Sequence, residues 1–377
     1  MNKIFLIFKI DIDENRIFGL DILRALAILF VVIGHGAYLL PEKLRPINDS
    51  FIFDGVSIFF VLSGFLIGGI LIKLIEKNGF NLKILKDFWI RRWFRTLPNY
   101  FLTLMILCSL HLIFDHGFSF SSIGNYFIFS QNLFYEHPSW FFPEAWSLSV
   151  EEWFYLLFPI IILLIFSINN SYQKSIFYAA IAVIFFITAF RYYRFSTIPI
   201  NSVNEWDLIF RKQVITRLDS LMFGVIGAYI YYYYTSIWQK YKVQFLIIGI
   251  ILLVALKFIL PDFVQINDAY SCVFSFTILS IATVLLLPYL SNLKSGKGFL
   301  YKAVTYISLI SYSMYLLNLS IVQKWILNKI PWSEFTDNDY IIILSKYSSY
   351  WLLVIGLSIL TYKYFEIPMT ALREKMK

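Results

Sequence analysis

The stretch GLDILRALAILFVVIGH, residues 19–35, decides the fold class. It is apolar almost throughout, and about 20 such residues form a helix that crosses roughly 30 Å of hydrocarbon. Comparable stretches recur along the whole chain, at 19–40, 52–74, 93–114, 146–167, 175–192, 213–235, 243–261, 268–290, 303–327 and 347–366. The sequence therefore predicts an all-α integral membrane protein with ten transmembrane helices in one bundle.

The overall composition points to the same class of protein. Of the 377 residues, 59% are hydrophobic and 15% are charged, whereas a soluble domain carries about 25% charge. The opening apolar run, 4–10, is too short to span and is followed by acids, so we expect no cleaved signal peptide. Only short loops separate the expected spans, without repeats or low-complexity tracts. We therefore treat residues 1–377 as a single membrane domain with no appended soluble domain.

The basic residues indicate the orientation, because cytoplasmic loops carry an excess of Lys and Arg. The region from Lys73 to Arg95 holds seven of them, whereas the loop 115–144 holds none. We therefore expect the first of these regions and both termini to be cytoplasmic, in a protein of the cytoplasmic membrane. The loop 191–212 is an exception, because it is expected outside. It contains Arg191, Arg194, Arg211 and Lys212.

The net charge of +8 is explained by this asymmetry and by anionic lipid headgroups, near which each basic residue is worth about 1 kcal/mol. We therefore name the lipid bilayer as a partner and expect no nucleic acid.

The first expected span carries two polar side chains, Arg24 and His35. They are eleven positions apart, which is three helical turns plus about 20°, so both point the same way at an axial separation of about 16 Å. Arg suits phosphate or carboxylate recognition, and His exchanges a proton near neutral pH. The alternative is a snorkelling Arg with a hydrogen-bonded core His.

Asp54 begins the second expected span at a depth comparable with that of His35. A carboxylate there could orient or charge-stabilise the imidazole, as carboxylates do for catalytic histidines. An N-cap role for Asp54 on its own helix is an equal alternative.

Two further groups of polar residues lie at the ends of expected helices. Arg92 and Arg95 are three apart and share a helix face, where they could bind the phosphates of a nucleotide-bearing donor. Glu151 and Tyr155 are one turn apart, and the acid either binds a polar acceptor's hydroxyls or forms a buried salt bridge.

The basic partner in such a salt bridge would be Arg217 or another basic residue. Arg217 and Asp219 are two apart and cannot pair within their own helix, so each is expected to reach another helix.

Several chemistries lack support in the sequence. Cys108 and Cys272 lie in apolar spans, and the histidines show no paired spacing, so we predict no metal. There is no G-x-S-x-G elbow, P-loop or dinucleotide fingerprint. The residues by themselves leave two classes open, a His-centred membrane enzyme and a proton-coupled transporter.

Seven ordered motifs resemble acyltransferase family 3, membrane acyltransferases that modify glycans and other small acceptors. They are GLDILRALAILFVVIGH at 19–35, FDGVSIFFVLSGFLI at 53–67, RRWFRTLP at 91–98, WSLSVEEWFYLLFP at 146–159, TRLDSLMFGVIGA at 216–228, SYSMYLL at 311–317 and YFEIP at 364–368. One departure is that the family commonly has a His where this chain has Asn318.

The resemblance implies that His35 is catalytic, with Arg24 its motif partner, Arg92 and Arg95 as the second arginine motif and Glu151 as the acid of the fourth motif. It also implies transfer of an acyl group, here expected to be acetyl. The donor would be cytoplasmic acyl-CoA, a co-substrate and no bound cofactor, and the acceptor a hydroxyl of a cell-surface or lipid-linked glycan.

The rival hypothesis is a proton-coupled exporter of a lipid or glycan, with His35, Glu151 and Asp219 relaying protons. The oligomeric state is left open by the sequence.

Overall fold

The computed structural model describes residues 10, 16–79 and 81–373, and within them every regular element is a helix. The long helices are α2 (Phe18–Gly36), α4 (Gly55–Asn78), α5 (Leu82–Phe114), α7 (Ala145–Asn169), α8 (Tyr172–Thr197), α10 (Leu218–Tyr233), α12 (Lys242–Phe258), α13 (Ser275–Leu290), α14 (Gly298–Leu317) and α15 (Asp339–Thr361). The all-α prediction is confirmed for these residues.

Short helices connect or extend the long ones. The α-helical ones are α3 (Arg45–Ser50), α6 (Gly124–Phe127), α9 (Val203–Trp206), α11 (Thr235–Lys240) and α16 (Ile367–Leu372). Four segments are π-helical: Asp207–Arg211, Tyr270–Phe274, Asn318–Ile326 and Tyr362–Glu366. Single 3₁₀ turns cover Ala37–Leu39, Glu42–Leu44, Phe120–Ser122, Val214–Thr216, Leu260–Asp262, Leu327–Lys329 and Trp332–Glu334.

The number of membrane spans differs from the sequence prediction in one place. Among the described residues, nine helices are long and apolar enough to cross a membrane. The remaining expected span, 213–235, contains α10, which has 16 residues and at 1.5 Å per residue is about 24 Å long. The count of ten spans therefore stays a prediction, whereas the multi-pass membrane architecture is supported.

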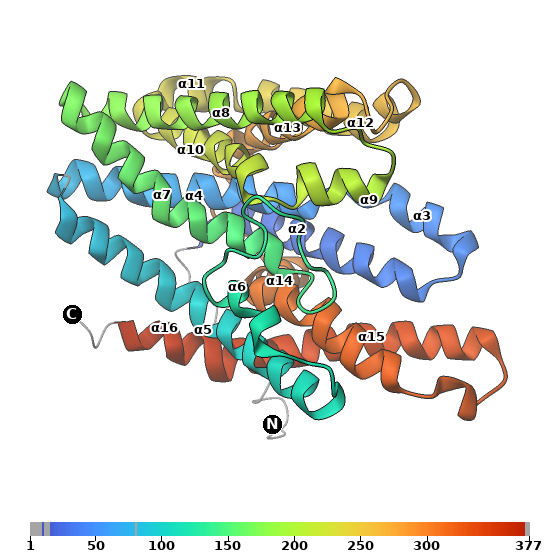
Figure 1. The fold of residues 1–377 in the computed structure, drawn as a ribbon. Coiled ribbons are helices and arrows are strands. Elements are labelled where there is room, and N and C mark those ends of the chain that lie inside the picture. The colour runs from blue at the N-terminus through green and yellow to red at the C-terminus, as the bar shows by residue number, and fades with distance from the viewer. Residues whose placement is uncertain (1–9, 11–15, 80, 374–377) are drawn as a thin grey trace.

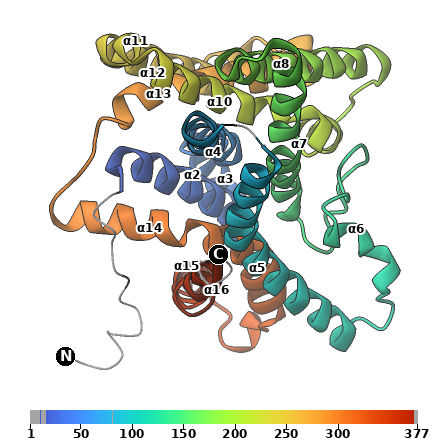
Figure 2. The same cartoon turned by 90° about the vertical axis from the view of Figure 1, so that its left-hand side faces the viewer.

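The long helices form three layers (Figures 1 and 2). Figure 2 shows α8, α10, α12 and α13 in one layer, α2, α4 and α7 in the middle, and α14, α15 and α16 on the opposite side, with α5 beside them. Helix α4 packs on α10 and α2, and α2 packs on α14, so one continuous set of contacts joins the three layers. The centre of the bundle therefore lies around α2 and α4.

Close backbone contact between α4 and α10 fixes the position of α4. A Cβ atom on Gly64 would lie 1.9 Å from the carbonyl oxygen of Leu221, and one on Gly224 would lie 2.1 Å from that of Val61. Small residues allow such contact between membrane helices, where no hydrophobic drive exists between them.

Two small residues stand four positions apart in each of these helices, Gly64 with Gly68 and Gly224 with Ala228. This spacing puts them on one helix face and predicts close packing from the sequence alone, which the contacts of Gly64 and Gly224 confirm.

Helix α12 lies at the edge of the bundle and packs mainly on α13. Gly249 is its one buried residue, and the apolar Ile247, Ile250 and Ile251 are exposed. An apolar helix with a bare outer face is typical of contact with lipid.

Candidate functional site

One polar cavity opens between α2, α4, α5, α7 and α14. Its lining includes five residues singled out in the sequence, Arg24, Arg92, Arg95, Glu151 and Tyr155. We call it the arginine cavity. Residues from three separate sequence motifs thus come together around one space.

The arginines of this cavity are poorly neutralised by the protein. Arg24 is 3.8 Å from Asp21, but that carboxylate already accepts bonds from Arg16 and from Ser308. Arg92 lies over the ring of Tyr155, 5.2 Å from its centroid. Its buried Nε has no hydrogen-bond partner in the described chain.

Arg95 is exposed at the same cavity. In the described part of the chain, no carboxylate oxygen lies within 4 Å of the Arg92 or Arg95 guanidinium. Glu151 and Glu366 also line the cavity, but neither forms an ion pair with its three arginines among the described contacts. The arginines therefore offer positive charge to an anionic ligand.

Glu151 also faces the arginine cavity. Its two oxygens accept hydrogen bonds from the hydroxyls of Ser63, at 2.7 Å, and Tyr155, at 2.9 Å. The bond to Tyr155 is the one-turn contact that their spacing suggested. The alternative salt bridge to Arg217 is not formed, because Arg217 bonds elsewhere, and Glu151 lines a different cavity from His35.

A second cavity contains His35. Its lining includes Asp54, Glu144, Arg211 and Lys212, and we call it the histidine cavity. The Nδ1 atom of His35 lies 2.6 Å from Oδ1 of Asn318. The residue that departs from the family pattern is thus the side-chain partner of the histidine.

Asp54 takes the second of the two roles left open by the sequence. It caps α4, accepting bonds from the backbone N–H of Ser57, at 3.2 Å, and from its hydroxyl, at 2.7 Å. It also pairs with Arg211 at 3.2 Å. Asp54 lines the histidine cavity but makes no hydrogen bond to His35 among the described contacts, and the side chain that bonds the imidazole is that of Asn318. Charge stabilisation of His35 by Asp54 stays a prediction.

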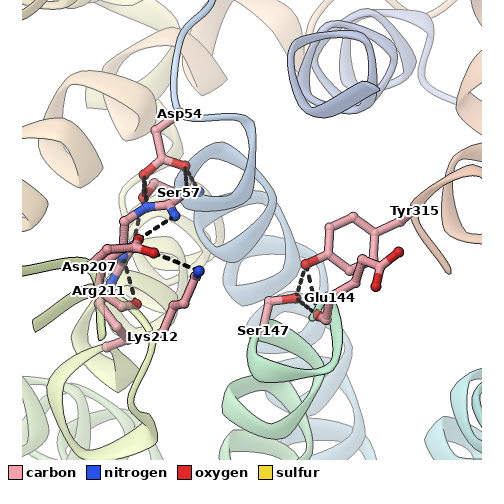
Figure 3. A network of polar contacts seen from close by, with 9 residues as sticks. Asp54, Ser57, Glu144, Ser147, Asp207, Arg211, Lys212 and Tyr315 are labelled. Carbon is pink, nitrogen blue, oxygen red and sulfur yellow. Dashed lines mark hydrogen bonds and ion pairs between the residues drawn. The ribbon is translucent and has the colours of Figure 1, made fainter. Parts of the chain in front are cut away.

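The basic residues of the loop 191–212 are bound within the protein. Arg191 pairs with Asp219 at 2.6 Å, where both side chains are fully buried, and Lys212 pairs with Asp207 at 2.5 Å. Figure 3 shows Asp207, Lys212 and Arg211 gathered beside Asp54. Burial raises the pKa of Asp207, but the charges of Arg211 and Lys212 outweigh it and hold that pKa below its usual value.

Arg194 and Arg217 also have hydrogen-bond partners within the protein. Arg194 donates to Gln213 and to the backbone oxygen of Ile209. Arg217 donates to the Ser57 hydroxyl at 2.6 Å and lies over the ring of Phe276. Arg217 and Asp219 each reach another helix, as their spacing suggested, and neither lines the arginine cavity or the histidine cavity.

Glu144 is a site residue to which the sequence gave no separate role. It is buried, and its side chain accepts bonds from the backbone N–H groups of Leu319, at 3.2 Å, and Ser320, at 2.7 Å, and from the Ser320 hydroxyl. Burial raises the pKa of Glu144 to about 7, although the bonds from Ser320 act in the opposite direction. Its position directly before a long apolar helix was the available signal.

The two cavities share a wall. Val56 and Tyr315 are the residues that line both. The Tyr315 hydroxyl lies 2.6 Å from the Ser147 hydroxyl and donates to the backbone oxygen of Glu144 at 3.0 Å, as Figure 3 shows. The arginine cavity and the histidine cavity thus share a boundary formed by Val56 and Tyr315.

The described residues contain no group of three or more His, Cys, Asp and Glu side chains that could hold a metal ion. Cys108 and Cys272 are buried and free.

Among the described residues, nine helices long and apolar enough to cross a membrane, with two polar cavities between the helices, are typical of a multi-pass membrane protein. A family model described as an acyltransferase domain matches residues 17–362. The chain belongs to this acyltransferase family, which is the family its motifs resemble.

Two relatives of the chain are named as O-acetyltransferases. The chain is 28% identical over 333 residues to "Putative O-acetyltransferase SACOL0978" of Staphylococcus aureus strain COL. It is 29% identical over 325 residues to "O-acetyltransferase OatA" of Staphylococcus aureus strain NCTC 8325 / PS 47. Each match covers 81% of this chain and 50% of the relative, so the chain spans about half the length of these curated relatives. No solved structure matches it.

Proposed function

We propose that the protein is a membrane O-acyltransferase that moves an acyl group, most simply acetyl, from acyl-CoA to a hydroxyl of a cell-surface or lipid-linked glycan. The observation that carries the proposal is the meeting of the two cavities at Val56 and Tyr315. One cavity has the charge that an anionic donor needs, and the other has a histidine that can remove a proton. The names of the O-acetyltransferase relatives favour acetyl as the acyl group.

The arginine cavity is the proposed donor site. The phosphates of acyl-CoA would bind Arg24, Arg92 and Arg95 through charge-assisted hydrogen bonds, each worth about 1.5 to 3 kcal/mol. The thioester would then point toward Tyr315. No resident cofactor is needed, because acyl-CoA is consumed as a co-substrate.

We propose that the arginine cavity opens to the cytoplasm, in a protein of the cytoplasmic membrane. Lys77 lies in the last turn of α4, and Lys83 and Lys86 lie in the N-terminal half of α5, which also carries Arg92 and Arg95. The ends of α4 and α5 that are joined in the chain lie at the same side of the bundle (Figure 1).

The basic residues of the loop 191–212 stay an exception to the positive-inside rule, which counts Lys and Arg and is not a rule of net charge. Three of them, Arg191, Arg211 and Lys212, pair with carboxylates within the protein.

The histidine cavity is the proposed acceptor site. His35 Nε2 would take the proton of the acceptor hydroxyl while the oxygen of that hydroxyl attacks the thioester carbonyl. The C–O bond forms, the C–S bond breaks, and CoA leaves as a thiolate that regains a proton. General base catalysis of this kind contributes about 10² to 10⁴ in rate.

The test measures transfer of labelled acetyl from acetyl-CoA to glycan in membranes that contain the protein at matched levels. We compare the wild type with His35→Ala and with the control His116→Ala, whose side chain is exposed and outside both cavities. Loss of transfer in His35→Ala alone supports the proposal. Equal transfer by all three proteins would remove His35 from the mechanism, and no transfer by the wild type would favour the exporter hypothesis.

A further inference from the structure

Asn318 is buried at the start of the π-helical segment Asn318–Ile326, directly after α14. Its side-chain amide has two ends with different partners. The Nδ2 end donates to the backbone oxygens of Met314 and Tyr315, both at 2.8 Å. A carbonyl oxygen can only accept, so these two bonds require the NH₂ group at this end.

The orientation of the amide determines the protonation of the histidine ring. Because the NH₂ group is committed to the backbone, the Oδ1 atom of Asn318 faces Nδ1 of His35 at 2.6 Å. An amide oxygen has no proton to donate, so His35 Nδ1 must carry one. In a neutral imidazole the lone pair is then on Nε2.

Neighbouring groups leave this assignment intact. The Tyr350 hydroxyl is 3.0 Å from the backbone oxygen of Val32 and 3.4 Å from Asn318 Oδ1, so its one proton has a nearer acceptor. Gln323 donates to the backbone oxygen of His35 at 2.7 Å and does not touch the ring. No described residue forms a hydrogen bond with His35 Nε2, and the residue lines the open histidine cavity.

We propose that Asn318 is a positioning residue that holds His35 with its proton on Nδ1 and its lone pair on Nε2, directed to the acceptor hydroxyl. The inference rests on the proposed function for its catalytic meaning, but the ring tautomer is a property of the resting protein. Asn318 thus performs with a neutral amide what a carboxylate does for other catalytic histidines. It orients the base without adding a negative charge to the cavity.

The direct measurement is ¹⁵N NMR of the full-length protein, labelled with ¹⁵N-histidine and held in lipid nanodiscs. The chain has four histidines, and a His35→Gln sample identifies the signal of His35. Protonated and unprotonated ring nitrogens have well-separated ¹⁵N shifts. We expect the wild type to show a protonated Nδ1 and an unprotonated Nε2, whereas Asn318→Leu should lose this preference. A wild-type ring with its proton on Nε2 would overturn the proposal.

Three variants separate positioning from a structural role of the amide. Asn318→Asp keeps an oxygen for His35 but loses the NH₂ donor to the backbone. If positioning matters, Asn318→Asp retains the tautomer and most of the transfer rate. Asn318→Leu should lower kcat by about 10- to 100-fold, as does loss of the hydrogen-bond partner of a metal-ligating histidine, with an unchanged donor KM. Equal losses in both folded variants would assign Asn318 a structural role and overturn the proposal. The control Gln323→Leu should keep the wild-type tautomer.

The pH profile adds a second activity readout. A carboxylate beside an imidazole favours the imidazolium form, so the rate of Asn318→Asp should reach half its maximum at a higher pH than that of the wild type. Asp54, Glu144, Arg211 and Lys212 also line the cavity and are identical in both proteins, so an unshifted midpoint would argue against contact between residue 318 and the ring. If the wild type transfers no acyl group, the proposed function fails while the NMR experiment still tests the role of Asn318.

Discussion

The two cavities handle their buried charges in opposite ways. Around the histidine cavity the cations have carboxylate partners, Arg211 with Asp54 and Lys212 with Asp207. In the arginine cavity, Arg92 and Arg95 have no carboxylate within 4 Å among the described residues, and Arg24 shares its acid with Arg16.

An ionisable group in a membrane costs at least about 2.5 kcal/mol on insertion scales. Around the histidine cavity, the carboxylates of the protein itself offset this cost for the cations. The difference indicates that one cavity is built to hold its shape and the other to bind an anion.

The largest expected effect is on a paired charge that is buried outside both cavities, the Arg191–Asp219 ion pair. Replacing Asp219 with Asn leaves Arg191 buried without its counter-ion, and we expect the free energy of unfolding to fall by about 3 to 5 kcal/mol. Thermal unfolding in detergent measures the loss. The double variant Arg191→Met/Asp219→Leu removes both charges and should recover much of the stability, whereas a single variant as stable as the wild type would contradict the view that paired buried charges hold this protein's shape.

The next effect is on the unpaired side and should leave stability unchanged. Replacing Arg92 with Ala removes a group proposed to bind donor phosphate, worth about 1.5 to 3 kcal/mol, so the apparent KM for acyl-CoA should rise about 10- to 100-fold. Arg91→Ala is the matched control, because Arg91 is exposed and lies outside the cavity. A large loss of stability in Arg92→Ala, without a change in the KM for acyl-CoA, would give this arginine a structural role and contradict its role in donor binding.

Glu144 sharpens the comparison, because it lines the histidine cavity without a cation within 4 Å among the described residues. Its pKa is raised from 4.5 to about 7, so the stabilisation from the protonated form is fully present below pH 4.5 and is lost as the pH rises through about 7.

Between pH 5 and 8, the wild type should therefore lose more stability than Glu144→Gln, by about 1 to 3 kcal/mol. Thermal unfolding across this range gives the measurement, and parallel curves would refute the assignment.

The smallest effect is expected at the shared wall. Tyr315→Phe removes the hydroxyl that bonds Ser147 and Glu144. The lost hydrogen bonding is worth about 1 kcal/mol, which corresponds to a roughly fivefold change in the rate of acyl-CoA hydrolysis. We expect water to reach the donor more easily, which raises acyl-CoA hydrolysis in the absence of acceptor. Tyr312→Phe is the control, since Tyr312 bonds the backbone oxygen of Thr96 and lines the arginine cavity alone. Equal hydrolysis by both variants would contradict a separating role for Tyr315.

Features with short-range causes could be predicted from the sequence. Apolar runs placed the helices, the four-residue spacing of Gly64 and Gly68 predicted close packing, and the capping role of Asp54 follows from its position before α4. The shared cavity of Arg24, Arg92 and Arg95 was predicted less directly, from the tendency of such groups to bind phosphate.

Long-range partners could not be predicted in the same way. His35 and Asn318 are 283 positions apart, and Arg191 and Asp219 belong to different helices. A single sequence contains no signal for which of many carboxylates or amides a buried group will meet. The loop 191–212 therefore looked like an excess of free positive charge, although its cations are bound within the protein.

The wall formed by Val56 and Tyr315 has an electrical consequence under the proposed orientation. Acyl transfer across it moves a formal acylium cation outward and leaves CoA thiolate on the cytoplasmic side. If the proton taken by His35 returns past Tyr315 to that thiolate, the exchange carries no net charge. If the proton is released outside, one charge crosses the membrane, which is worth about 2.3 kcal/mol per 100 mV. The dependence of the rate on an imposed membrane potential would therefore show on which side of Tyr315 the proton leaves.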